Sequence, residues 1–274
     1  MYEDFYGLSG RPFQLTPDPD FYFESVSHKK ALSYLGYGLS QGEGFIVITG
    51  EVGAGKSTLV AHLMQRIDPA QLTVARVVTS ALDGEELIHV VAQSFGLEVD
   101  GHDKAGALGA IERFLQDEAR QGRRCLLVVD ECQNLDIEAL EELRMLSNMN
   151  ADKHQLLQLI LVGQPELKNL LQAPELEQFA QRISSDFHLR PLPKEAVPDY
   201  IKFRLESCGA TKPIFDSGAT ALIAAASGGV PRKINILCDT ALMYGFAAET
   251  HTINSAIIGA VLEDKKEFGI FLPA

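Results

Sequence analysis

The stretch "FIVITGEVGAGKSTLV", residues 45–60, constrains the fold more than any other part of the sequence. An apolar run is followed by a glycine-rich octet and then by a helix-forming pattern. Residues 50–57 fit G-x-x-x-x-G-K-[S/T] without a mismatch. Glycines let the backbone wrap around a phosphate and present N–H groups at the positive end of the following helix. The sequence therefore predicts a phosphate-binding loop between a strand and a helix.

This loop is expected to hold a nucleotide together with Mg²⁺. In the motif, Lys56 lies along the β- and γ-phosphates, and the Ser57 hydroxyl binds the metal. A glycine-rich turn with a chance lysine is the weaker interpretation, because the full motif stands between the strand and the helix that it requires. The residues expected to contact the nucleotide are Gly50, Glu51, Val52, Gly53, Ala54, Gly55, Lys56, Ser57 and Thr58.

A second acidic element follows the apolar run 126–129 in "CLLVVDECQNL". Asp130 stands at the end of this expected strand, where ligands bind in parallel sheets, and is predicted to bind Mg²⁺. Glu131 follows directly and is predicted to be the general base that takes a proton from the attacking water. Taken alone, an Asp-Glu pair is more often an exposed strand end or a helix cap. The complete phosphate loop favours the catalytic interpretation.

Short apolar runs alternate with amphipathic helical patterns: "GFIVITG", "LTVARVV", "CLLVVDE", "LLQLILVG" and "DFHLRPL". Each run is too apolar for a half-exposed strand, so we predict a parallel sheet covered by helices on both faces. The spacing between Lys56 and Asp130 leaves room for a whole strand with its helices. Another strand can therefore lie between the two that carry these residues. Helices are expected over residues 57–66, 84–95, 105–122 and 137–149.

After "RPLPKEAVP" the strand signal stops and only helical patterns remain, over residues 196–207, 217–226, 231–247 and 254–267. The predicted fold class is thus α/β: a three-layer P-loop NTPase core with a parallel sheet, plus a small C-terminal all-helical domain. We predict three parts. Residues 1–43 are a proline-interrupted segment and helix flanking the nucleotide site, residues 44–192 the ATPase core, and residues 193–274 a helical lid.

The composition is that of an ordinary globular chain, 46% hydrophobic and 22% charged. No apolar stretch approaches the roughly 20 residues that span a bilayer. The N-terminus "MYEDFYGLSG" lacks the basic-then-apolar order of a signal peptide, so we expect a cytoplasmic protein. The four cysteines have no CxxC spacing and are expected to be buried thiols rather than metal ligands or disulfides.

The opening "FYGLSGRPFQLTPDPDFYF", the run "SHKKALSYLGYGL", the loop "GEVGAGKST", "VVDECQNL" and "LQLILVGQPEL" together resemble the AAA+ ATPases of the general secretion pathway protein A (ExeA-like) class. The resemblance covers essentially the whole chain. Its specific parts are the opening segment and "VGQPEL", because the loop is shared by many proteins. Within the class, the sequence is most similar to the XrtA/PEP-CTERM (exosortase) system-associated ATPase. The resemblance implies an AAA+ fold, ATP and Mg²⁺ as ligands, and a homo-oligomeric ring or spiral.

The resemblance also implies roles for residues outside the two motifs. Gln164 falls where such ATPases place a polar sensor of the γ-phosphate and the attacking water; a simple strand-end turn residue is the alternative. Arg182 in "FAQRISSDF" matches an arginine finger that reaches a neighbouring subunit's nucleotide, although Arg190 is a competing candidate and a surface ion pair the plainer alternative. Arg232 in "SGGVPRKINIL" resembles the lid arginine that contacts the γ-phosphate; simple capping of the helix entry is the weaker alternative.

The opening segment matches the part of this class that surrounds the adenine. Tyr22, Phe23 and His28 are candidates for that contact, with packing anchors as the alternative. ATP is expected rather than GTP, because the sequence has no NKxD-type guanine signature. Some relatives continue into a transmembrane segment and a peptidoglycan-binding domain. This sequence shows neither, so we expect no direct membrane insertion but a peripheral position at the inner membrane through a protein partner.

Three functions are compatible with these patterns. The first is an Mg²⁺-dependent ATPase (hydrolase) that powers or switches the assembly of an exopolysaccharide/PEP-CTERM or secretion-type export system. The second is a DNA-binding ATP switch of the transposition (TniB/TnsC-like) type. The net charge of −13 and the dispersed basic residues disfavour it, although a small basic patch is compatible with them. The third, a nonhydrolysing scaffold, is disfavoured by the intact Asp130 and Glu131.

Overall fold

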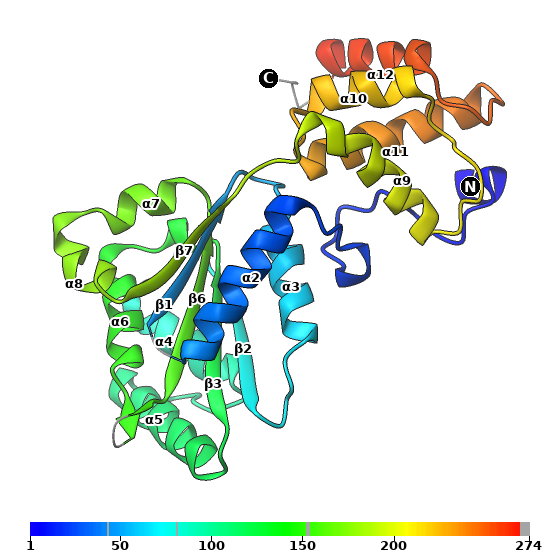
Figure 1. The fold of residues 1–274 in the computed structure, drawn as a ribbon. Coiled ribbons are helices and arrows are strands. Elements are labelled where there is room, and N and C mark those ends of the chain that lie inside the picture. Colours follow the sequence, from blue (N-terminus) through cyan, green and yellow to red (C-terminus); the bar gives the residue numbers. More distant parts are fainter. Residues whose placement is uncertain (43, 81, 152–153, 269–274) are drawn as a thin grey trace. The chain divides into compact units, whose positions relative to one another are not determined.

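The structure is a computed structural model that describes residues 1–42, 44–80, 82–151 and 154–268. The chain divides into two compact units (Figure 1). The sheet unit comprises Lys30–Gly50 and Leu63–Leu189. The helical unit comprises Met1–Lys29, Glu51–His62 and Arg190–Ala274. The three-part division predicted from the sequence stays a prediction.

The sheet unit is built on a five-stranded parallel sheet in the order β2-β3-β6-β1-β7, which confirms the predicted sheet. Strand β6 pairs with β1 on one side and with β3 on the other. A strand therefore does lie between the strand before the loop and the strand that carries Asp130. The strands are β1 (Phe45–Gly50), β2 (Leu72–Val78), β3 (Arg124–Asp130), β6 (Leu157–Gly163) and β7 (Ile183–Leu189).

The central strands are buried on both faces, as their continuous apolar sequences require. On one face Val47, Val129 and Leu161 join the core cluster formed with three helices. These helices are α4 (Gly84–Ser94), α5 (Lys104–Arg120) and α6 (Ile137–Ser147). The other face is crossed by α2 (Val26–Gln41), where Gln158 Nε2 donates to the Gly38 carbonyl at 2.8 Å (Figure 1).

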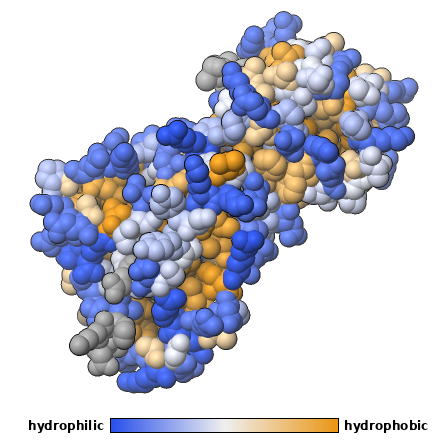
Figure 2. Space-filling view, viewed as in Figure 1, coloured by the Kyte–Doolittle hydropathy of each residue, from blue (hydrophilic) through white to orange (hydrophobic). Residues whose placement is uncertain are grey.

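The expectation that every strand is fully buried is wrong for the two edges of the sheet. Strand β7 begins at Ile183, before the apolar run predicted for it, and alternate residues along it are exposed. In β2, Val78 is 64% exposed. Figure 2 shows hydrophobic residues at the surface beside α2, over β2, whereas most of the visible face is hydrophilic. An edge strand has only one neighbouring strand, so part of its surface stays in solvent.

The eight helices predicted with bounds are confirmed to within two residues at their ends. The structure adds short elements without a periodic sequence signal: α1 (Tyr2–Tyr6), α7 (Glu166–Leu171), α8 (Glu177–Ala180), the hairpin of β4 (Asn150–Ala151) and β5 (His154–Gln155), and the 3₁₀ turns η1 (Pro19–Phe21), η2 (Cys132–Asn134), η3 (Pro174–Leu176) and η4 (Lys194–Ala196). All four cysteines are buried and free, as expected.

The helical unit confirms the predicted C-terminal helical region. Its helices are α9 (Val197–Ser207), α10 (Ser217–Ser227), α11 (Pro231–Ala247) and α12 (Ser255–Phe268). They share a core that includes Ile201, Ile223 and Leu242. The phosphate loop and the start of α3 (Lys56–Gln65) belong to this unit by their contacts.

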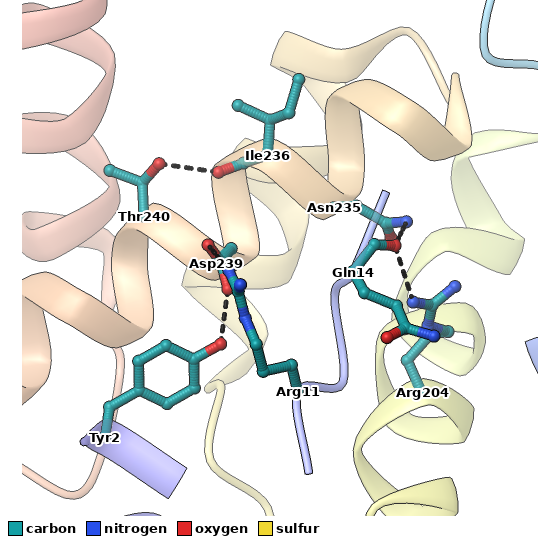
Figure 3. Close-up of polar contacts among 8 residues, drawn as sticks. All are labelled: Tyr2, Arg11, Gln14, Arg204, Asn235, Ile236, Asp239 and Thr240. Carbon is teal, nitrogen blue, oxygen red and sulfur yellow. Dashed lines mark hydrogen bonds and ion pairs between the residues drawn. The ribbon is translucent and has the colours of Figure 1, made fainter. Parts of the chain in front are cut away.

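The N-terminal segment is anchored on α9 and α11 by polar contacts (Figure 3). Arg204 is only 6% exposed; its Nε donates to the Pro12 carbonyl at 2.5 Å and its Nη2 to the Gln14 carbonyl at 3.2 Å. Its guanidinium lies 4.1 Å from the centre of the Phe21 ring. On α11, Asp239 accepts a hydrogen bond from the Tyr2 hydroxyl. The segment is therefore part of the helical unit's core.

Replacing Arg204 with Met should destabilise the helical unit by about 2–4 kcal/mol, because two buried carbonyl groups lose a charged donor while the volume is kept. Lys202→Met, on the same helix but with a 70% exposed side chain, should change stability by less than about 0.5 kcal/mol. Urea unfolding followed by circular dichroism measures both. Equal midpoints for the two variants would contradict the anchoring role of Arg204.

Candidate nucleotide site

The loop between β1 and α3 adopts a conformation that requires glycine at two positions. Gly53 has φ of 80° and Gly55 has φ of 100°, in the region that side chains other than hydrogen rarely allow. A Cβ on Gly53 would lie 2.4 Å from the Cβ of Arg232. The Gly53 carbonyl also accepts the Arg232 backbone N–H at 3.2 Å. The glycines of the motif thus allow the loop to curve and to pack against α11.

Helix α3 begins at Lys56, so Lys56, Ser57 and Thr58 form its first turn. The N–H groups of a first turn have no partner within the helix, which is why phosphates bind there. Lys56 is 6% exposed, and its Nζ donates to the Glu51 carbonyl at 3.1 Å. Glu51 and Val52 are exposed at the loop tip, and Ala54 is buried. This arrangement is the one that a phosphate-binding loop needs.

Two of the three aromatic candidates from the opening segment lie against the loop and α3. The Tyr22 ring stacks on His62 of α3, with centroids 3.9 Å apart and an angle of 11°. His28 Nε2 lies 3.0 Å from the point that a Cβ on Gly55 would occupy. Phe23 packs instead against Tyr200 and a second aromatic ring of α9. Phe23 is thus a packing residue in this structure.

His28 is buried beside the loop, where its ring shares a hydrogen bond with Ser25 Oγ at 2.8 Å. Burial lowers the pKa of His28 from 6.5 to about 4, because the charged imidazolium would lose its hydration. The ring is therefore neutral at neutral pH.

Asp130 ends β3 with a carboxylate that is almost fully buried and charge-compensated. Arg76, on β2, brings its Nη2 to 2.7 Å from Asp130 Oδ2. The other oxygen, Oδ1, accepts the backbone N–H of Glu131 at 3.0 Å. A carboxylate and a hydroxyl are oxygen ligands of the kind that Mg²⁺ uses together with substrate phosphates. Asp130 and Ser57 fit that role by their chemistry.

The described residues contain no group of three or more His, Cys, Asp or Glu side chains that could hold a metal ion by themselves. Mg²⁺ sites in nucleotide-binding proteins commonly use one or two carboxylates and complete their coordination with phosphates and water. Asp130 and Ser57, the ligands expected from the sequence, would form a site of this kind, completed by phosphates and water.

Glu131 adopts a left-handed backbone conformation, with φ of 58°. Its carboxylate oxygen Oε2 accepts hydrogen bonds from Gln133 Nε2 at 2.6 Å and from Gln164 Nε2 at 3.2 Å. Thr79 Oγ1 lies within hydrogen-bond distance of the carbonyls of Asp130 and Glu131, at 2.8 and 2.9 Å. The structure thus brings Glu131 and Gln164 together, as the sequence resemblance implied.

The arginine candidates differ in exposure. Arg182 is half-buried before β7, and its Nη1 donates to Ser147 Oγ at 3.2 Å. Arg190, directly after β7, is exposed. Arg232 is exposed in the first turn of α11, which begins at Pro231 as the sequence indicated. Both arginines near β7 stay candidates for the finger.

Sequence reasoning missed Arg76, Thr79 and Gln133, which contact the acidic pair. Arg76 had a usable signal, because it is a charged residue inside the apolar run "LTVARVV". Gln133 stands two residues after Glu131 in the stretch "VVDECQNL" that carries the resemblance, but no role was predicted for it. Thr79 had no signal, because its partners come from β3.

The parallel sheet, the glycine loop opening α3 and the acidic pair at the end of β3 define a P-loop ATPase fold. Residues 39–171 match the family described as AAA domain. The expected fold class and the expected enzyme class, an ATPase, are confirmed by these similarities.

The chain is 39% identical over 257 residues to general secretion pathway protein A of Aeromonas hydrophila, a match that covers 92% of this chain and 46% of that protein. The chain therefore spans less than half of this relative. The ORC2 protein of Aeropyrum pernix, in ADPNP–ADP complexes, has a similar fold (TM-score 0.72, 18% identity, 93% of this chain and 71% of that one). So does the RuvB Holliday junction branch migration motor of Thermotoga maritima (TM-score 0.57, 18% identity, 94% and 72%).

The comparisons support likeness to the secretion protein A class. Membership of the XrtA/PEP-CTERM subgroup stays a prediction. Among the described residues, no helix combines the length and the apolar character needed to cross a bilayer.

Lowering the pH should weaken the helical unit through His28. Its pKa is lower in the folded protein than in the unfolded chain, so the stabilisation is complete above pH 6.5 and is lost as the pH falls towards 4. The difference between 6.5 and about 4 corresponds to about 3 kcal/mol. Urea unfolding between pH 7 and 4 should show a smaller fall for His28→Gln than for the wild type. The exposed His102→Gln should keep the full fall; identical pH profiles for all three proteins would contradict this account.

Proposed function

We propose that this chain binds ATP with Mg²⁺ and hydrolyses it to ADP and phosphate. The observation that carries the proposal is the loop of residues 50–57, whose glycine conformations and helix start are those of a phosphate-binding loop. In this proposal Gly50, Glu51, Val52, Gly53, Ala54, Gly55, Lys56, Ser57 and Thr58 contact the phosphates, and Arg232 adds a contact from α11. Asp130 and Ser57 hold the metal.

In the proposed reaction a water oxygen bonds to the γ-phosphorus while the bond from that phosphorus to ADP breaks. Glu131 takes the proton from the water, and the Gln164 amide orients the water and the γ-phosphate. Lys56 places its charge along the β- and γ-phosphates. Bound Mg²⁺ supplies further positive charge to the same phosphates.

We further propose that hydrolysis depends on assembly with other copies of this chain. An arginine supplied by a neighbouring subunit stabilises charge in the transition state and couples hydrolysis to assembly. Arg182 is the first candidate, because the resemblance points to it. Arg190 is the second, because its side chain is the exposed one of the pair.

The proposed cellular role is to power or switch the assembly of an export machine through a protein partner at the inner membrane. The likeness to general secretion pathway protein A supports a secretion-type system. Exopolysaccharide export with the PEP-CTERM system is the finer proposal and rests on the sequence resemblance alone.

A DNA-dependent switch is the second candidate. Solved structures of similar fold include Aeropyrum pernix ORC1 in complex with DNA, but its identity to this chain is 16%, which supports the shared fold only. The net charge of −13 opposes a broad phosphate-binding surface.

Steady-state ATP hydrolysis across a protein dilution series, with and without duplex DNA, separates these proposals. If the rate of ATP hydrolysis per chain is the same with and without DNA and falls steeply on dilution of the protein, a self-assembling ATPase with a protein partner is supported. Turnover stimulated by DNA would move the assignment to the DNA-dependent switch. Absence of hydrolysis at every concentration, with and without DNA, would overturn the ATPase proposal.

Glu131→Gln should reduce turnover by about 100-fold or more while leaving ATP bound, because the amide cannot accept the water proton. Turnover and the ATP retained on the protein after gel filtration are the two measurements. Glu138→Gln, at an exposed carboxylate in α6, is the control and should behave as wild type. Wild-type turnover in Glu131→Gln would remove Glu131 as the base.

Arg182→Ala should leave nucleotide affinity unchanged and slow hydrolysis about 1,000-fold at protein concentrations where the chain is assembled. Arg190→Ala, measured in parallel, tests the competing candidate. Addition of the Glu131→Gln protein, which keeps both arginines, should partly restore turnover in the arginine variant that lacks the finger. An equal loss in dilute monomer and in assembled protein would contradict a role in trans.

A further inference from the structure

We propose that Gln133 is a positioning residue for the base Glu131: it holds one carboxylate oxygen so that the other takes the proton from water. This inference rests on the proposed function, since it assigns a partner to the base of that reaction. Gln133 lies in the stretch "VVDECQNL" that carries the resemblance, but neither the loop motif nor the resemblance assigned it a role.

The side-chain amide of Gln133 is bonded at both ends. Its Nε2 donates to Glu131 Oε2 at 2.6 Å, and its Oε1 accepts the backbone N–H of Gln164 at 2.9 Å. A carboxylate only accepts and a backbone N–H only donates, so these two partners determine which way the amide points. Gln133 therefore connects the turn after β3 to the end of β6.

Both amide donors reach the same oxygen of Glu131. Gln164 Nε2 lies 3.2 Å from Oε2, the oxygen that Gln133 also bonds. Each carboxylate oxygen has about two lone-pair sites, so two donors use those of Oε2. Oε2 is thus occupied by the two amide donors, and Oε1 is the oxygen left to take the proton from water.

The surroundings leave room for this amide and hold the turn that carries Glu131. Gly163 has no side chain to obstruct it: a Cβ there would lie 3.0 Å from Gln133 Oε1 and 2.8 Å from Leu167 Cδ2. Thr79 Oγ1 lies within hydrogen-bond distance of the carbonyls of Asp130 and Glu131. Cys132, between Glu131 and Gln133 in the sequence, is fully buried. Gln133 and Gln164 thus hold the Glu131 carboxylate, and Thr79 contacts the turn that carries it.

The plainer account is that Gln133 only ties the end of β3 to the end of β6. The two accounts differ in which end of the amide matters. Gln133→Glu keeps an oxygen for the Gln164 N–H but has no hydrogen to donate to Glu131. Gln133→Leu keeps the approximate volume and loses both bonds.

If Gln133 positions Glu131, both variants should lower kcat by roughly 10- to 100-fold, because small displacements of a catalytic group cost about that much. The KM for ATP and the Kd for a nonhydrolysable ATP analogue should stay within about twofold of wild type, since positioning acts on the chemical step. Gln116→Leu is the matched control: Gln116 also donates to a glutamate, Glu112 at 3.3 Å, but on the surface of α5. It should leave all three values unchanged.

Combining Gln133→Leu with Glu131→Gln makes the test specific. If Gln133 acts through Glu131, its loss should reduce single-turnover hydrolysis little further once the base is absent. If Gln133 only connects β3 to β6 and acts independently of Glu131, the double variant should instead lose activity by the product of the two single losses.

Wild-type kcat in Gln133→Glu would overturn the positioning role, and so would a loss matched by weaker analogue binding. If Gln133→Leu fails to fold, Gln133→Glu with wild-type analogue binding still decides the matter. Failure of the proposed function is a different result: wild-type protein without ATP hydrolysis, or Glu131→Gln with wild-type turnover.

Discussion

The pairing of β3 with β6, buried on both faces, is the constraint on which the acidic part of the site depends. The residues along these strands are apolar because helices cover both faces. Apart from Gln158 of β6, polar groups are therefore confined to the strand ends, and parallel pairing places both C-terminal ends at one edge of the sheet. Gln164 meets Glu131 and Gln133 there because β3 and β6 are neighbours in the sheet, although Gln164 follows Glu131 by 33 residues along the chain.

The phosphate loop depends on a different set of contacts, those of the helical unit. Gly53 packs on Arg232 of α11, and Tyr22 stacks on His62 of α3. Arg204 binds the N-terminal segment that carries Tyr22 onto the same unit. The loop, α11 and the opening segment thus pack together within the helical unit.

Local patterns in the sequence sufficed for the strand–loop–helix arrangement of residues 45–65, the parallel sheet and the long helices. They allowed a strand between β1 and β3 but did not say which one. They failed where a partner is distant along the chain. The pairing of Arg76 with Asp130, the amide network of Gln133 and the anchoring by Arg204 depend on which strands and helices become neighbours. The half-exposed β7 was misjudged for the same reason, because burial of a strand depends on its place in the sheet. The roles of the site residues and the three-part division of the chain stay predictions.

Isothermal titration of ATP into the purified protein, with Mg²⁺ and with EDTA, tests the central claim most directly. The account predicts one ATP per chain, tighter binding with Mg²⁺ than without it, weaker binding of GTP, and no heat with a Lys56→Ala variant that keeps the wild-type circular dichroism spectrum. Absence of ATP binding by the wild-type chain in both conditions would contradict the account, and so would equal binding by Lys56→Ala.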